Sequence, residues 1–139
     1  MSLLFSPTQG FELPARFKTV INKCVASSAQ LSEATQAITL NFRDPNYSAE
    51  QGGYHPLEVR LEKRASGWKF IYITDFCYLD FYQPELVKEV DICFASKTVR
   101  VMDRAINDFF AGQYIRDFIR NFLSYHQLGV FEVEVSCEN

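Results

Sequence analysis

The chain has 139 residues, of which 47% are hydrophobic and 22% are charged. This size and composition are typical of one folded domain, here residues 1–139, and exclude a disordered chain. The formal net charge at pH 7 is −3 and the Lys and Arg residues are scattered along the chain, so no basic stripe is present and nucleic acid is not expected as a direct ligand.

The sequence contains no segment that predicts a membrane or secretory protein. The apolar runs are too short to span a bilayer, and the N-terminal MSLLFSPTQGF lacks the basic start and the apolar core of a signal peptide. We therefore expect a cytoplasmic protein that does not bind membranes.

The first third of the chain predicts a helix followed by a strand. Pro14 can open a helix, and apolar residues then recur at helical spacing as far as Val25, which predicts a helix near residues 14–27. The Ser-rich segment after it is typical of a loop. Residues 38–42 alternate between apolar and polar side chains, which is the pattern of a half-buried strand.

A β-hairpin is the clearest local prediction. Residues 57–61 alternate between apolar and polar side chains, Ala65-Ser66-Gly67 marks a turn, and residues 68–76 return. The returning segment, WKFIYITDF, is apolar on both faces. We therefore expect it to be central in the sheet, with an outer face that is apolar enough to be adhesive.

The rest of the chain predicts two short strands, a long helix and a final strand. Residues 90–94 alternate, and residues 99–101 suggest a short partner strand. From Ile106 the apolar period becomes helical, Gly129 stands where a helix would stop, and residues 131–135 alternate again. The prediction is an α+β fold: a mostly antiparallel sheet of about four to six strands with two long helices packed on one face.

The segment RDPNYSAEQGGYHP, residues 43–56, is the least core-like part of the chain and the place where we expect a binding site. Functional residues concentrate in loops on rigid scaffolds, and a glycine pair lets the backbone approach a ligand or take positive φ. An ordinary wide turn has the same composition, so a purely structural loop is the alternative. The candidate binding residues in this loop are Asp44, Tyr47, Glu50, Gly52, Gly53, Tyr54 and His55.

His55 is also a candidate for acid–base chemistry. If the hairpin pairs as predicted, Glu58, Arg60 and Asp75 come close to it, and a histidine that contacts an orienting carboxylate can transfer protons. A hydrogen-bonded structural histidine is the alternative. The sequence has no Ser-His-Asp order, nucleophile elbow, HExxH motif, Walker loop or dinucleotide fingerprint. An enzyme is therefore not favoured, and no catalytic residue is assigned.

No metal ion or cofactor is predicted. The four cysteines are widely spaced and only two histidines are present, so a ligand set with zinc spacing is lacking. We interpret the cysteines as reduced and mostly buried thiols. Asp75 and Asp80 could pair at a metal, but a strand end followed by a solvated loop is the favoured interpretation. The residues concerned are Cys24, Cys77, Cys93, Cys137, His55 and His126.

Aromatic residues make up 15% of the chain, which suggests a protein interface as well as a large core. Aromatic side chains dominate interface hot spots, but they also close the ends of sheets. Both interpretations apply to the run Phe76, Tyr78, Phe81 and Tyr82.

The segment NFRDPNYSAEQGGYHPLEVRLEKRASGWKFIYITDF, followed by PELVKEVDICF, resembles a family of small uncharacterised bacterial proteins known as a domain of unknown function. The resemblance covers about Asn41 to Phe94, and YSAEQGGYHPLEVRLEK is its most specific part. It implies a bacterial, soluble, stand-alone domain, some of whose relatives are carried on mobile genetic elements. It implies no activity, ligand, cofactor or site residue.

Three hypotheses about function follow. The first is a non-enzymatic domain that binds a protein partner or a second copy of itself through the outer face of residues 68–76 with Tyr47 and Tyr54. The second is a small enzyme or small-molecule binder with a pocket between the Gly52-Gly53 loop and the central strand. The third is a regulator linked to nucleic acid, with contacts from Arg16, Lys18 and Lys23.

Overall fold

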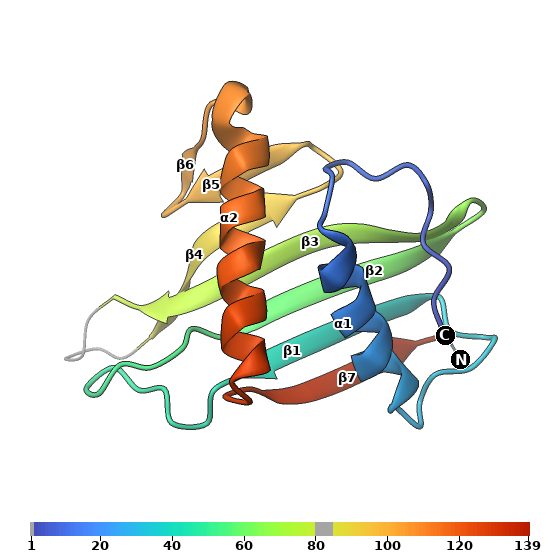
Figure 1. Ribbon diagram of the computed structural model, residues 1–139, viewed down its shortest axis with the longest axis horizontal. Coiled ribbons are helices and arrows are strands. Elements are labelled where there is room, and N and C mark those ends of the chain that lie inside the picture. The colour runs from blue at the N-terminus through green and yellow to red at the C-terminus, as the bar shows by residue number, and fades with distance from the viewer. Residues whose placement is uncertain (1, 80–84) are drawn as a thin grey trace.

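The computed structural model describes residues 2–79 and 85–139 and contains two helices, α1 (Ala15–Ala26) and α2 (Asp108–Gln127). The strands are β1 (Ala37–Arg43), β2 (Leu57–Arg64), β3 (Gly67–Tyr78), β4 (Leu86–Cys93), β5 (Thr98–Val101), β6 (Arg104–Ala105) and β7 (Glu132–Glu138). They form one sheet in the order β6-β5-β4-β3-β2-β1-β7, with antiparallel neighbours throughout. Both helices lie on the same face of this sheet (Figure 1).

The structure confirms the α+β class, the antiparallel sheet and the two helices on one face, and it corrects the number of strands. The described residues form seven strands rather than four to six. The strand that no pattern predicted is β6, which has two exposed residues and therefore no alternation to detect. A turn brings β6 back onto β5, and Met102 and Asp103 in that turn have φ values of 49° and 65°.

The core lies between the sheet and the helices. Alternate residues of β1 and β2 point into it and are almost fully buried, as the period-two pattern predicted. Phe122 of α2 joins the two helices to the sheet, because its ring contacts Phe17 of α1 at 6.0 Å and Phe42 of β1 at 4.9 Å between centroids. The helices bury Phe17, Ile21, Val25, Ala111, Ile115, Ile119, Phe122 and Leu123.

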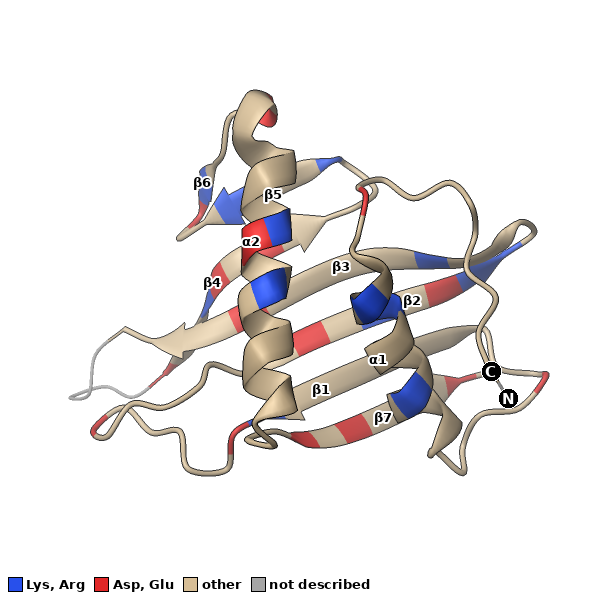
Figure 2. Cartoon of the chain, in the orientation of Figure 1, with Lys and Arg blue, Asp and Glu red and all other residues tan. Residues whose placement is uncertain are grey.

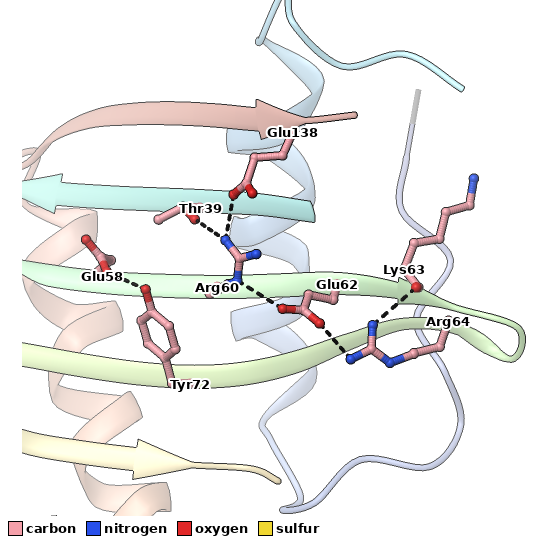
Figure 3. A network of polar contacts seen from close by, with 8 residues as sticks. All are labelled: Thr39, Glu58, Arg60, Glu62, Lys63, Arg64, Tyr72 and Glu138. Carbon is pink, nitrogen blue, oxygen red and sulfur yellow. Dashed lines mark hydrogen bonds and ion pairs between the residues drawn. The ribbon is translucent and has the colours of Figure 1, made fainter. Parts of the chain in front are cut away.

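The face of the sheet opposite the helices is polar. Arg60 donates hydrogen bonds to Glu138 at 2.6 Å, Thr39 at 3.3 Å and Glu62 at 3.1 Å, and Arg64 donates to the other oxygen of Glu62 at 2.6 Å. Figure 3 shows that this network crosses from β7 to the β2–β3 hairpin, with the helices behind the sheet. Such a face is typical of a solvated antiparallel sheet.

β3 is central in the sheet, as expected. Three of its large apolar side chains, Trp68, Phe70 and Ile73, are buried on the helix side rather than placed on an adhesive outer face. Residues 4–6 lie beside the start of β3, where the Trp68 N–H donates to the Leu4 carbonyl at 2.9 Å. Tyr72, on the outer face, donates its hydroxyl proton to Glu58 across the strands.

A β-bulge lies where β3 pairs with β4. The register shifts between Thr74 and Phe76, so that Asp75 on β3 lies opposite both Glu89 and Val90 on β4. The Val90 N–H donates to the Asp75 carboxylate at 2.7 Å. A bulge redirects a side chain that regular alternation would place on the opposite face. Here it turns Glu89 toward the helix side of the sheet, where it contacts His55.

Neither helix of the described residues has the length and apolarity that crossing a membrane requires.

Candidate functional site

A pocket of about 380 Å³ lies where the β1–β2 loop meets the C-terminal half of α2; Figure 1 shows this loop beside the lower end of that helix. We call it the α2 pocket. One end is formed by His55, Asp75 and Glu89, which we call the polar cluster, and the other end is largely aromatic. Three separate parts of the chain therefore meet at this one site: the β1–β2 loop, the β3–β4 bulge and α2.

The polar cluster joins three titratable groups at short distances. Nδ1 of His55 lies 2.9 Å from Oε1 of Glu89 and 3.6 Å from Oδ2 of Asp75. About a third of the His55 and Glu89 side chains is exposed, whereas only 8% of the Asp75 side chain is. The cluster is thus buried at Asp75 and open to the pocket at the other two residues.

Asp75 binds its proton far more tightly than an exposed aspartate does. Burial is the main cause, and the adjacent Glu89 carboxylate adds to it; together they raise the pKa of Asp75 to about 8. Two close carboxylates cannot both ionise without strong repulsion in a site of low dielectric constant. At neutral pH the pair therefore retains a proton that an exposed aspartate would have lost.

Aromatic side chains form the rest of the pocket. The ring of Tyr54 lies 4.8 Å from that of Tyr125 on α2 and 6.3 Å from that of Phe131. Phe118 and Asn121 add a half-buried ring and an exposed amide from the same helix. A ligand with an apolar body would find contact area here and polar partners at the other end.

Asp44 stabilises the conformation of the β1–β2 loop. Its buried carboxylate accepts hydrogen bonds from the N–H groups of Asn46 at 2.9 Å and Tyr54 at 3.0 Å. Gly53 has φ of 132°, and a Cβ at this position would lie 2.9 Å from Oδ2 of Asp44. The loop therefore requires glycine at position 53, and its close backbone approach involves Asp44 rather than a ligand.

Tyr47 supports His55. The two rings lie 5.2 Å apart, and the Tyr47 ring lies 5.1 Å from that of Tyr78. The Tyr78 N–H donates to the Tyr47 hydroxyl at 2.9 Å. Gly52 exchanges two backbone hydrogen bonds with Ser48. The Tyr47 ring therefore packs against one side of the His55 imidazole.

The ten residues that the sequence selected fall into three groups. Those that line the pocket are Gly53, Tyr54, His55 and Asp75. Those that belong to the loop without lining the pocket are Asp44, Tyr47, Glu50 and Gly52. Of these, Glu50 is exposed in the turn between Ser48 and Gly52. Glu58 and Arg60 are not near His55, because alternation along β2 places them on the face opposite the helices (Figure 3).

Sequence reasoning missed Glu89 and the contribution of α2. Regular alternation with Val90 would turn the Glu89 side chain away from the core, and only the bulge redirects it. Tyr125 and Asn121 adjoin the predicted apolar stripe of the helix, but their proximity to the β1–β2 loop depends on how the helix packs. No local pattern carries either signal.

The remaining candidate groups have other places in the fold. Cys77 is buried, and the other three cysteines are half-buried rather than mostly buried as predicted. His126 packs between Phe42 and Phe122, and burial lowers its pKa. Asp80, Phe81 and Tyr82 lie outside the described residues.

The basic residues of the third hypothesis lie on α1 or at its ends. Figure 2 shows Lys and Arg at several positions along both helices. Lys18 lies over the ring of Phe5, with its ammonium group 5.8 Å from the ring centroid. Lys23 lies in the last turn of α1.

The fold and pocket define a two-layer α+β protein with a small polar and aromatic cavity. The sequence matches the family described as a protein of unknown function, DUF2787, over residues 15–136, and the chain belongs to that family. The resemblance inferred from the loop and hairpin is therefore confirmed. No curated protein matches.

Two solved structures from Vibrio cholerae are similar to the chain. The hypothetical protein VC0508 from the VSP-II pathogenicity island has 27% sequence identity and a TM-score of 0.85, and the match covers 97% of this chain and 99% of that one. The conserved hypothetical protein VC1805 from pathogenicity island VPI-2 has 28% identity and a TM-score of 0.75, with 96% and 100% covered. VC1805 is described as sharing structural homology with the human P32 protein.

Proposed function

We propose that the protein binds a small molecule in the α2 pocket. The polar group of the ligand would contact the polar cluster, and its apolar body would pack against Tyr54 and Tyr125. The observation that carries this proposal is that both kinds of surface meet in a single cavity. This is the second of the three hypotheses raised by the sequence, in its binding rather than its enzymatic form.

The size and the chemistry of the pocket support the proposal. Small-molecule sites are usually concave, about 300–1,000 Å³ in volume, and mostly apolar with a few convergent polar groups; the α2 pocket has about 380 Å³. Asp75 is buried close to a second carboxylate, and its pKa is raised to about 8. Side chains in a cavity with strongly shifted pKa values are characteristic of functional sites. Such an arrangement lowers the stability of the fold, and proteins retain unfavourable arrangements of this kind mainly where function requires them.

The interaction hypothesis has less support in its original form. Trp68 is buried, Tyr47 packs on His55, and Tyr54 packs on Tyr125. These side chains therefore do not form one exposed apolar patch on the outer face of the sheet, which was the surface that this hypothesis required.

The proposal is tested with a variant in which the pocket is filled. Asn121→Trp places a large side chain at the wall of the pocket on an exposed position of α2, and Ser124→Trp makes the same change one turn later, outside the pocket. A library of small aromatic and aliphatic compounds with polar head groups is screened by thermal shift against the wild-type protein. At a concentration 100-fold above Kd, a ligand stabilises the folded state by about 2.7 kcal/mol.

We expect the wild-type protein and Ser124→Trp to be stabilised by the same compounds, and Asn121→Trp to lose the effect. A library that stabilises none of the three proteins, or hits that Asn121→Trp retains, would contradict binding in the α2 pocket.

A second candidate function is self-association at the start of α2. Phe109 is 85% exposed and Phe110 is 59% exposed, and their rings contact each other at 5.1 Å. Two adjacent exposed phenylalanines are typical of an interface. Light scattering over a tenfold concentration range tests this candidate: it predicts a dimer that Phe109→Ser dissociates, and a monomer at every concentration would exclude it.

A further inference from the structure

The donor atoms of the polar cluster are spaced like the ligands of a metal ion. Nδ1 of His55 lies 2.9 Å from a Glu89 oxygen and 3.6 Å from an Asp75 oxygen, and the three donor atoms lie within 4.8 Å of one another. Nitrogen and oxygen ligands bind Zn²⁺ at roughly 2.0–2.2 Å, which places neighbouring ligands of a tetrahedral site about 3.3–3.6 Å apart. The distance from His55 to Asp75 already has this value, and the distance from His55 to Glu89 is shorter.

The surroundings hold two of the ligands in place. One oxygen of Asp75 accepts the Val90 N–H at 2.7 Å, which leaves the other oxygen turned toward His55. The ring of Tyr47 packs against His55. Metal sites are typically supported by outer contacts that fix the orientation of each ligand.

The charge of the cluster also favours a cation. Among the described residues, no Lys or Arg forms an ion pair with Asp75 or Glu89, and His55 is the basic group within 4 Å of both carboxylates. Within that part of the chain, the two carboxylates therefore contact one imidazole and no ammonium or guanidinium group that would repel or displace a cation. A divalent cation between the three side chains would balance their charge.

We propose that the polar cluster binds one divalent transition-metal ion of the zinc type. Its ligands would be Nδ1 of His55 and one carboxylate oxygen from each of Asp75 and Glu89. A mixed imidazole and carboxylate set suits Zn²⁺ and related ions better than Mg²⁺ or Ca²⁺. Three protein ligands leave a coordination position open toward the pocket, as in zinc sites that bind a water or a substrate.

The inference rests on the proposed function in one respect, because it assigns the ligand class for the same pocket. A small molecule in the α2 pocket would carry a head group that coordinates the metal, such as a carboxylate, hydroxamate or thiolate. Its aromatic or aliphatic body would contact Tyr54 and Tyr125. The metal site itself depends only on the three ligand residues.

The test uses the full chain, freed of metal with EDTA and kept reduced. Zn²⁺ binding is measured by isothermal titration calorimetry, and Co²⁺ serves as a spectroscopic substitute whose absorption bands report the type of ligand. The variants are His55→Gln and Glu89→Gln, and Glu50→Gln is the matched control because it removes an exposed carboxylate of the same loop. Circular dichroism confirms that each variant is folded.

We expect one metal ion per chain, unchanged affinity in Glu50→Gln, and at least a 100-fold loss of affinity in His55→Gln and in Glu89→Gln. Absence of binding to the wild-type protein would overturn the inference. So would binding that both variants retain with a cobalt–thiolate absorption band, since the metal would then be bound by cysteines. If the wild-type protein binds no added metal but still binds library compounds in the α2 pocket, the metal site is refuted and the proposed function stands.

Discussion

Replacing Asp75 by Asn is expected to remove a pH dependence from the stability of the fold. Asp75 has an ordinary pKa near 3.8 when exposed, and burial with the adjacent Glu89 raises it to about 8 in the folded protein. Between these values the folded state binds a proton that the unfolded state has released. This group therefore stabilises the fold most at low pH, and its contribution is lost as the pH rises through about 8.

The magnitude follows from the linkage relation. One bound proton changes the free energy of unfolding by up to about 1.4 kcal/mol per pH unit, so the largest possible loss between pH 6.5 and 8.5 is about 2–3 kcal/mol. Glu89 is partly exposed and solvent screens part of the repulsion, so we expect about 1–2 kcal/mol. Asparagine has the same shape, keeps the oxygen that accepts the Val90 N–H, and cannot ionise.

The other titratable groups near Asp75 define the pH window. Glu89 and His55 contact it, while burial raises the pKa of Cys77 and of Tyr114 on α2 above their ordinary values of 9 and 10. In a window of pH 6.5–8.5 the carboxylate pair therefore releases its proton, whereas folded Cys77 and Tyr114 keep theirs.

The assay is urea denaturation of metal-free protein at several pH values in this window. The free energy of unfolding of the wild-type protein and of Glu50→Gln should fall as the pH rises, whereas that of Asp75→Asn should stay nearly constant. An equal slope in Asp75→Asn would mean that the carboxylate pair holds no extra proton, which contradicts the raised pKa of Asp75.

Three further predictions concern the scaffold, and urea denaturation measures each of them. Gly53→Ala should destabilise the fold by about 1–3 kcal/mol, because φ is 132° and the new Cβ meets Asp44. Gly112→Ala, inside α2 with no atom within 4 Å of the new Cβ, should instead stabilise the fold by about 0.5–1 kcal/mol. Equal effects of the two substitutions would contradict this prediction. Asp44→Ala should cost about 1–3 kcal/mol, since the Tyr54 N–H loses its acceptor, and a neutral result would mean that water replaces it. Ile119→Ala, at a fully buried position, should cost about 2–5 kcal/mol, and a loss below 1 kcal/mol would contradict its place in the core.

Most of the fold could be predicted because hydrophobic periodicity is local. The alternation in β2 and the helical period of α2 each reflect one face that must be buried, so the sequence alone carries that information. β6 could not be predicted, because two exposed residues carry no period. Its position depends on a turn with positive φ at Met102 and Asp103, and methionine is an unusual residue for such a conformation.

The site could be predicted only in part, for a different physical reason. The loop composition indicated His55, and the hairpin register brought Asp75 close to it. Glu58 and Arg60 were wrongly predicted to lie near His55. Successive residues in a strand point to opposite faces, so both side chains lie on the face of β2 opposite the helices. Glu89 shows the opposite deviation. Alternation places it on the outer face, but the bulge turns it toward the helix side.

Binding in the α2 pocket, rather than elsewhere on the surface, is tested most directly by titrating ¹⁵N-labelled protein with a compound from the thermal-shift screen and following the amide chemical shifts. We expect the largest changes at Gly53, Tyr54, His55 and Asn121, which line the pocket. Changes concentrated instead between α1 and α2, around Arg16 and Arg116, would contradict binding in the α2 pocket.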